Sequence, residues 1–198
     1  MSNFSRRGLL KSGAALGVLA ATGLPVAAQA KRGGRLRMGL NGANTSDNWD
    51  SRTHSDIFMI SSAQGAVFDS LTEVAADGVL KGELATDWEV SADAKTWTFN
   101  LRKGVTFHNG DPFTSDDVLF TYERSNDPEQ SIHSKNLANV ASVEKLSDFE
   151  VKFTLKKPQA SFLTKTTERA SGRALTIVSK GAIESMGLSS YGLAPVGT

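Results

Sequence analysis

Residues 84–120 read LATDWEVSADAKTWTFNLRKGVTFHNGDPFTSDDVLF, and this stretch decides the fold. Trp97, Phe99 and Leu101 occupy every second position within it, which is the period of a strand with one buried face. The polar residues between them suit the opposite, solvent-facing side. The stretch therefore predicts a half-buried strand over residues 96–102.

The alternation continues beyond Gly104 at Val105 and Phe107, where a second extended piece is expected. Asn109 and Gly110 follow, and this dipeptide favours a tight turn because both residues tolerate a positive φ. We therefore expect a loop between this strand region and the next element.

A helix is expected to begin directly after this loop. Thr114 is a typical N-cap residue, and Asp117 three positions later places an acid in the first turn, where it opposes the positive end of the helix dipole. Val118, Leu119 and Tyr122 supply the apolar side of the helix.

Outside this stretch, spacing predicts four further elements. Apolar residues three and four apart predict a helix with one buried face, whereas alternation predicts strands. The helix carries Ile57, Ile60, Ala63, Val67 and Leu71, and the strands cover residues 35–40, 151–155 (ending before Pro158) and 175–178. Strands and helices mix without a strict βαβ rhythm, so the residues favour an α+β fold.

The first 30 residues have the composition of an export signal. Arg6 and Arg7 resemble a twin-arginine motif, an apolar stretch follows, and Ala28 and Ala30 suit a signal peptidase, so we expect a mature start at Lys31. An uncleaved membrane-anchoring N-terminus is the alternative. Removing the three cations of this segment turns the net charge of +1 into −2.

Composition excludes several classes of function. The chain has no cysteine, which excludes disulfides, thiol catalysis, thiolate metal sites and a lipid anchor on cysteine. Beyond the leader no basic stripe with interleaved aromatic residues occurs, so nucleic acid is not an expected partner. The three histidines, His54, His108 and His133, lack the spacing of a zinc site.

The stretch at 84–91, 95–102, 104–110 and 112–120 resembles the family 5 extracellular solute-binding proteins, the peptide- and nickel-binding components of ABC importers. The resemblance implies a periplasmic binding protein-like fold of mixed α+β or α/β type, with two lobes (type II) and an extra inserted domain. On that pattern residues 31–64 start lobe I, 65–178 form the extra domain and 179–198 return into lobe I. Residues 195–198 resemble the approach to a Gly-Pro-Tyr segment, which implies an N-terminal fragment of a longer protein.

The same resemblance implies a soluble periplasmic protein that captures small peptides, without a cofactor, and delivers them to ABC permease subunits after export through the twin-arginine translocase. A nickel chelate, haem, glutathione or a sugar fits the family equally well as ligand. The resemblance also brings the polar loop before residue 57 close to the ligand cleft.

Five residues are therefore candidates for ligand contact: Trp49, Arg52, Thr53, His54 and Arg173. A site needs aromatic area and a few polar groups, and a guanidinium matches the two oxygens of a carboxylate. Arg173 resembles in position an arginine that nickel-binding relatives direct toward an anionic chelator. The alternative for the loop residues is a solvated loop, and for Arg173 a merely basic surface.

Two other classes of function stay open at this stage. Ser142 and Lys145 match the Ser-x-x-Lys pattern of a secreted hydrolase, although the companion motifs are absent and no helix is expected to begin there. A chaperone or sensor subunit that binds a protein partner is the other alternative.

Overall fold

The computed structural model describes residues 35, 37–63, 66–167 and 174–198, so the expected leader and Arg173 lie outside the described residues. The chain divides into two compact units, residues 1–39 and 40–198. The first unit contributes few described residues, and none of them lies in a strand, so the strand predicted at 35–40 is wrong. A strand exists only through hydrogen bonds to a neighbour, and no described strand pairs with this segment.

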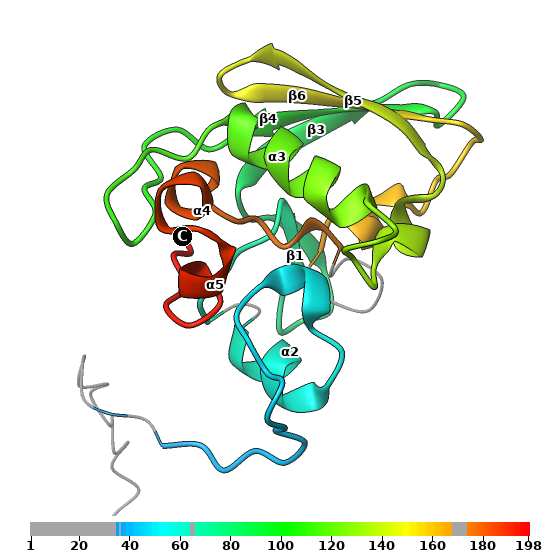
Figure 1. Ribbon diagram of the computed structural model, residues 1–198. Coiled ribbons are helices and arrows are strands. Elements are labelled where there is room, and N and C mark those ends of the chain that lie inside the picture. The colour runs from blue at the N-terminus through cyan, green and yellow to red at the C-terminus, as the bar shows by residue number, and fades with distance from the viewer. Residues whose placement is uncertain (1–34, 36, 64–65, 168–173) are drawn as a thin grey trace, which may run out of the picture. The chain divides into compact units, whose positions relative to one another are not determined.

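The core of the second unit is a four-stranded antiparallel sheet (Figure 1). Its spatial order is β3 (Ala85–Val90), β4 (Thr96–Leu101), β6 (Glu150–Leu155) and β5 (Val140–Ser147). The two central strands alternate buried and partly exposed positions along their whole length. The predictions of strands at 96–102 and 151–155 are confirmed, with the first ending one residue earlier.

Cross-strand aromatic packing holds the two central strands together. Phe99 lies opposite Val151, and Trp97 lies opposite Phe153. The rings of Phe99 and Phe153 meet edge to face with centroids 5.6 Å apart, a favoured aromatic geometry. These buried rings form the centre of the larger hydrophobic core.

Helix α3 (Ser115–Asn126) packs across this sheet, and it begins where the sequence predicts (Figure 1). The Thr114 side chain accepts a hydrogen bond from the Asp116 backbone, and the Asp117 carboxylate accepts one from the Thr114 backbone. This reciprocal capping box satisfies amides that the first helical turn leaves without partners. Asp117 also accepts a hydrogen bond from the Lys180 backbone at 3.0 Å, which joins the starts of two helices.

The predicted Asn109-Gly110 turn is confirmed. Gly110 has a φ of +91°, and the Phe107 backbone donates to the Asp111 carbonyl at 2.9 Å across the turn. The extended piece predicted around Phe107 reduces to one isolated bridge, between Thr106 and Pro112. Two backbone hydrogen bonds flank this bridge, from Phe107 to the Asp111 carbonyl and from Phe113 to the Val105 carbonyl.

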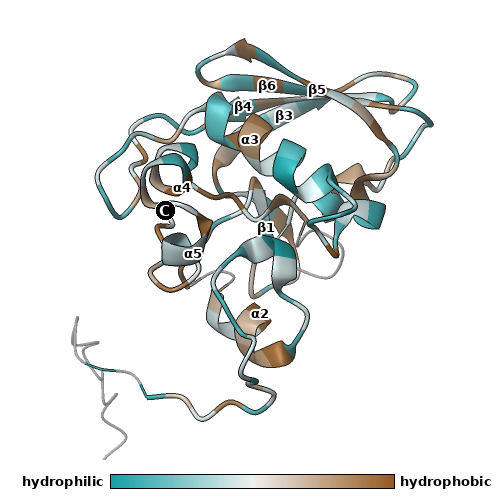
Figure 2. Ribbon diagram, in the orientation of Figure 1, coloured by the Kyte–Doolittle hydropathy of each residue, from teal (hydrophilic) through white to brown (hydrophobic). Residues whose placement is uncertain are grey.

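Helix α2 (Ile57–Ala63) is shorter than the predicted 57–71 helix and turns a different face inward. Met59 and Ala63 are buried, whereas Ile57 is 56% exposed, and Figure 2 shows an apolar stretch on this helix. The backbone amides of Val67 and Phe68 both donate to the Ala63 carbonyl, which closes the helix end. Residues 66–71, which were expected to stay helical, are not helical, and a short hairpin of β1 (Thr72–Val74) with β2 (Leu80–Gly82) follows them.

Residues 176–179 are buried and irregular, so the strand predicted at 175–178 is also wrong. A continuous apolar run is compatible with a buried strand, but no strand of the described chain pairs with this segment, whose Ile177 amide donates to the Asp69 carbonyl. Helices α4 (Lys180–Met186) and α5 (Leu188–Tyr191) come next. The described residues also form the short 3-10 turns η1 (Ser51–Thr53), η2 (Ser134–Leu137) and η3 (Phe162–Lys165).

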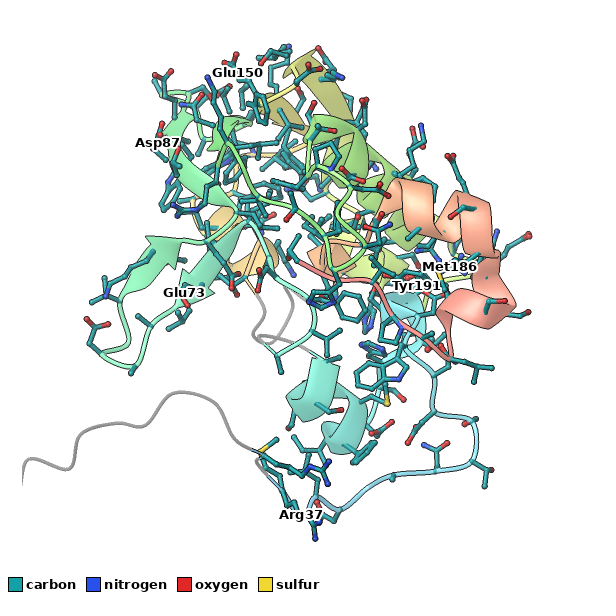
Figure 3. All side chains as sticks on the ribbon, turned by 90° about the vertical axis from the view of Figure 1, so that its left-hand side faces the viewer. Arg37, Glu73, Asp87, Glu150, Met186 and Tyr191 are labelled. Atoms are coloured by element: carbon teal, nitrogen blue, oxygen red, sulfur yellow. The ribbon has the colours of Figure 1, made fainter. Side chains whose placement is uncertain are left out.

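A smaller hydrophobic cluster joins these C-terminal helices to α2. Figure 3 shows Tyr191 among aromatic side chains, while Asp87 and Glu150 project from the sheet. The rings of Tyr191 and Phe68 lie 6.5 Å apart. Among the described residues, no helix combines the length and apolarity needed to cross a membrane.

Candidate functional site

The loop that carries four of the predicted ligand contacts folds through its own polar side chains. The Asn44 side chain accepts from the Ser46 backbone at 2.9 Å, and Asp47 accepts from the Asn44 backbone at 2.8 Å. Asn48 likewise accepts from the Asp50 backbone at 2.8 Å. Asn and Asp form such local turns readily, so the composition of the loop directly encodes its course.

A buried ion cluster fixes the end of this loop. The Asp50 carboxylate accepts from Arg52 Nη2 at 2.7 Å and from Arg124 Nη2 at 3.1 Å. Arg52 Nη1 also donates to Gln130 Oε1 at 2.7 Å. The side chains of Asp50, Arg52 and Arg124 are 6%, 8% and 10% exposed, respectively. The Asp50 carboxylate therefore joins the loop to α3, and Gln130 is tied to the cluster through Arg52.

The electrostatics of the cluster follow from burial and charge. Burial alone would raise the pKa of Asp50, but the hydrogen bond from Arg52 and the charges of both arginines hold that pKa below its ordinary value. Burial lowers the pKa of Arg124, and the Asp50 carboxylate opposes that effect. The cation of Arg124 also lies over the Phe120 ring, 5.4 Å from its centroid.

Trp49 and His54 pack inward on either side of the η1 turn. The Trp49 backbone donates to the Gly192 carbonyl at 2.9 Å, and its half-buried ring packs against the smaller hydrophobic cluster. His54 is 1% exposed, and its Nε2 lies 3.2 Å from the Asn48 carbonyl oxygen. Its Nδ1 has no hydrogen-bond partner within the described part of the chain. Burial lowers the pKa of His54, which favours the neutral ring.

Thr53 is the exposed member of the predicted set. Its hydroxyl donates to the Asp50 carbonyl at 2.9 Å. It borders a shallow polar depression of about 310 Å³, whose other lining residues are Asn44, Ser46, Asp47, Asn48, Ser55, Asp56 and Met59. This depression offers hydroxyl, amide and carboxylate groups to a ligand with backbone-like donors and acceptors.

A second depression, of about 440 Å³, lies on the other side of the ion cluster. Arg52 and Arg124 border it together with apolar residues of α3, α4 and α5, namely Phe120, Ile183 and Leu188. Glu123, Asp127, Gln130 and Glu184 complete its lining. The structure thus brings the loop candidates into one region, where Thr53 borders the first depression and Arg52 the second.

Sequence analysis missed Asp50 and Arg124, the two residues that pair with Arg52. The buried positions of α3 include Asp117, Thr121 and Ser125, so polar side chains recur on its inner face. These three residues are four positions apart in the sequence, which is the spacing of one helix face, so a helix with polar contacts on its inner face could have been predicted. Nothing in the sequence identifies Asp50 as the partner. Arg173 lies outside the described residues.

The Ser-x-x-Lys pattern lies on strand β5, where it does not form a catalytic pair. Residues three apart on a strand point to opposite faces, and the structure gives Ser142 and Lys145 separate partners. The Ser142 hydroxyl contacts Glu144, whereas Lys145 pairs with Asp116 and Asp148, each at 2.8 Å. Within the described ranges, no group of three or more His, Asp or Glu side chains is placed to hold a metal ion.

Comparison with known proteins adds a family relationship. Residues 79–187, more than half of the chain, match the profile described as bacterial extracellular solute-binding proteins, family 5 Middle. The di/tripeptide-binding protein 1 of Pseudomonas aeruginosa is 41% identical over 121 residues, which cover 51% of this chain and 22% of that protein. The nickel-binding periplasmic protein of Escherichia coli is 38% identical over 102 residues, which cover 51% of this chain and 20% of that protein.

Among solved structures, the periplasmic binding protein DppA of Helicobacter pylori in complex with the peptide STSA superposes with a TM-score of 0.67 at 27% identity. The match covers 77% of this chain and 33% of that one. The chain thus spans about a fifth of the length of these two curated relatives and a third of the solved structure.

Proposed function

This chain belongs to the bacterial extracellular solute-binding proteins of family 5, and from that premise we propose that it is part of the substrate-binding component of an ABC importer. The observation that carries the proposal is the continuous match over residues 79–187, which includes the strands and helix of the larger core. Fold alone would not license a function, but relatives named for binding solutes agree on one class.

The proposed ligand is a small peptide. Its support is the set of relatives named for dipeptides and tripeptides, together with a peptide-bound structural relative. An extended peptide offers backbone donors and acceptors at regular intervals, and the polar depression beside Thr53 carries groups of both kinds.

Within this proposal, the predicted contact residues take different parts. Exposed Thr53 meets the ligand directly, and half-buried Trp49 borders it. Buried Arg52 and His54 hold the loop in place, since the Arg52 guanidinium donates to Asp50 and Gln130 and His54 Nε2 lies against the Asn48 carbonyl oxygen. Arg173 is proposed to contact a carboxylate of the ligand.

The proposal extends to location and organisation. Residues 1–30 act as a twin-arginine signal that is cleaved after passage through the translocase, and the mature protein works in the periplasm with permease subunits as partners. Residues 31–64 and 179–198 belong to lobe I, and residues 65–178 form the inserted domain.

A chelated nickel ion is the second candidate ligand, because a nickel-binding periplasmic protein matches about as well as the peptide binders. The described residues hold no cluster of metal-ligating side chains, which favours recognition of an anionic chelate over direct coordination of the metal. A guanidinium such as that of Arg173 suits the carboxylates of such a chelate.

Native mass spectrometry of the protein, purified from the periplasm without refolding, tests the proposal. A peptide adduct is the expected result, whereas a nickel-containing adduct would select the second candidate. Calorimetric titration with dipeptides then compares Thr53→Ala with Thr106→Ala, which alters an exposed threonine in the remote 105–112 turn. We expect weaker binding only for Thr53→Ala. Absence of any adduct and of any binding heat would contradict the function.

A further inference from the structure

The dipeptide Asn-Gly occurs twice in the chain, at residues 41–42 and 109–110. Asn-Gly is chemically special because glycine has no side chain, so its backbone nitrogen can approach the side-chain carbonyl carbon of the asparagine without steric obstruction. Attack of the glycine nitrogen on this carbon releases the amide nitrogen of the asparagine side chain as ammonia. Each copy is therefore a potential site of deamidation, and the structure decides between them.

The two copies share their exposure and glycine conformation, and they differ in hydrogen bonding and in the packing of the Ile57 side chain near Gly42. Both asparagines and both glycines are exposed. Gly42 and Gly110 even share a φ of +91°. Differences in exposure or in glycine conformation therefore cannot separate their reactivity.

The copy at 109–110 is held by three hydrogen bonds. The Gly110 backbone donates to the Phe107 carbonyl at 2.8 Å, which occupies the attacking nitrogen. The Asn109 side chain accepts from the Asp111 backbone at 3.1 Å and donates to the Asp111 carboxylate at 2.7 Å. Both reacting groups are thus fixed in a geometry that serves the turn.

The copy at 41–42 has none of these restraints. Throughout the described residues, neither the Asn41 side chain nor the Gly42 backbone nitrogen has a hydrogen-bond partner. We propose that Asn41 is a site of spontaneous deamidation in the folded protein, whereas Asn109 is protected by its turn.

The proposed reaction balances with water as the only co-reactant. The Gly42 nitrogen gives up its proton to solvent and forms a bond to Asn41 Cγ. The Cγ–Nδ2 bond then breaks and ammonia leaves, so that a five-membered succinimide remains. Water opens this ring at either carbonyl, giving aspartate or isoaspartate at position 41.

The modification introduces a carboxylate into the chain that leads to the polar depression beside Thr53. Asn44, Asp47 and Asp56 line that depression, and position 41 lies three residues before the first of them. The inference concerns the chemistry of the chain itself and does not depend on the proposed function.

Peptide mapping by mass spectrometry after incubation at mildly alkaline pH tests the inference. We expect conversion of Asn109 to be at least roughly tenfold slower than that of Asn41 in the folded chain, because several hydrogen bonds must open first. In concentrated urea that difference should disappear. Equal rates in the folded chain, or a difference that persists in urea, would overturn the proposal.

Two variants sharpen the test. Asp111→Ala removes the acceptor for the Asn109 side chain and should accelerate conversion of Asn109 without changing Asn41. Asn41→Ser should abolish the isoaspartate signal from the 41–42 peptide, and its persistence there would contradict the assignment. Neither position is buried, so both variants are expected to fold.

Discussion

At the scale of single residues, Asp50 decides how the predicted ligand loop is held. It is the shared acceptor of two buried guanidinium groups, so Asp50→Ala would leave both cations facing each other without a counter-charge. We expect the free energy of unfolding to fall by about 3–5 kcal/mol. Urea denaturation followed by tryptophan fluorescence measures the change.

Asp77→Ala is the matched control for this prediction. Asp77 also pairs with a cation, Lys81, but both side chains are half exposed or more. An exposed pair contributes at most about 1 kcal/mol, so this variant should unfold almost like the parent chain. If Asp50→Ala and Asp77→Ala lowered the free energy of unfolding equally, burial would not be the reason that the ion cluster stabilises the fold.

His54 makes stability depend on pH. Its pKa is lowered by burial from 6.5, so the unfolded chain binds a proton at a higher pH than the folded chain does. The contribution of His54 to the free energy of unfolding is therefore complete above pH 6.5. It declines as the pH falls toward the folded-state pKa, with a slope of at most about 1.4 kcal/mol per pH unit.

His54→Gln should remove this component while retaining an amide near the position of Nε2. Unfolding curves measured between about pH 7 and pH 5 should then show a shallower pH dependence for the variant than for the parent. If His54→Gln left the pH dependence unchanged, His54 would have to be protonated equally in both states.

At the scale of secondary structure elements, the capping box at Thr114 is expected to stabilise α3. Thr114→Ala removes the side-chain acceptor for the first-turn amides, and we expect a loss of about 1 kcal/mol. Thr114→Ser keeps the hydroxyl and should restore most of the stability. Thermal unfolding monitored by circular dichroism distinguishes them, and equal melting temperatures for both variants would argue against the cap.

The elements that sequence analysis predicted correctly are those whose signals are local. The alternation at Trp97, Phe99 and Leu101 and the cap at Thr114 depend only on neighbouring residues, and the structure confirms both. The alternating segment at 35–40 and the apolar segment at 175–178 have no partner among the strands that the structure describes. Pairing is a tertiary property, which alternation alone does not reveal.

The site was harder to predict for the same reason. Local composition singled out the loop around Thr53, but the contact between Asp50 and Arg124 joins residues 74 positions apart. A single sequence does not encode such pairings visibly. His54 was expected in a polar loop, but it is buried, and the Phe68 ring lies beside it with 6.5 Å between ring centroids.

At the scale of the whole described unit, one glycine near its C-terminal end joins three distant segments. The Gly197 carbonyl accepts from the His108 backbone at 2.8 Å, and its own backbone nitrogen lies 3.3 Å from His108 Nδ1. The neighbouring Thr198 donates to the Asp69 carboxylate at 2.9 Å. This segment therefore connects the 105–112 turn to the strip of chain that follows α2.

Gly197 also lies too close to that strip to carry a side chain. A Cβ atom at this position would meet the Val67 carbonyl oxygen at 1.6 Å, and a backbone atom cannot move aside as a flexible side chain can. Gly197→Ala should therefore displace the C-terminal segment and lower the free energy of unfolding by about 1–3 kcal/mol. Hydrogen exchange should show faster exchange at His108, whose amide loses its acceptor.

Gly39→Ala is the matched control, because nothing lies within 4 Å of the Cβ that it would add. The two substitutions are chemically identical, so only the packing around each site distinguishes them. Loss of stability in Gly197→Ala with unchanged exchange at His108 would place the strain elsewhere and contradict the proposed connection. If Gly197→Ala lowers both the free energy of unfolding and the protection of the His108 amide, this contact keeps three segments together. These are the C-terminal segment, the 105–112 turn and the strip of chain that follows α2.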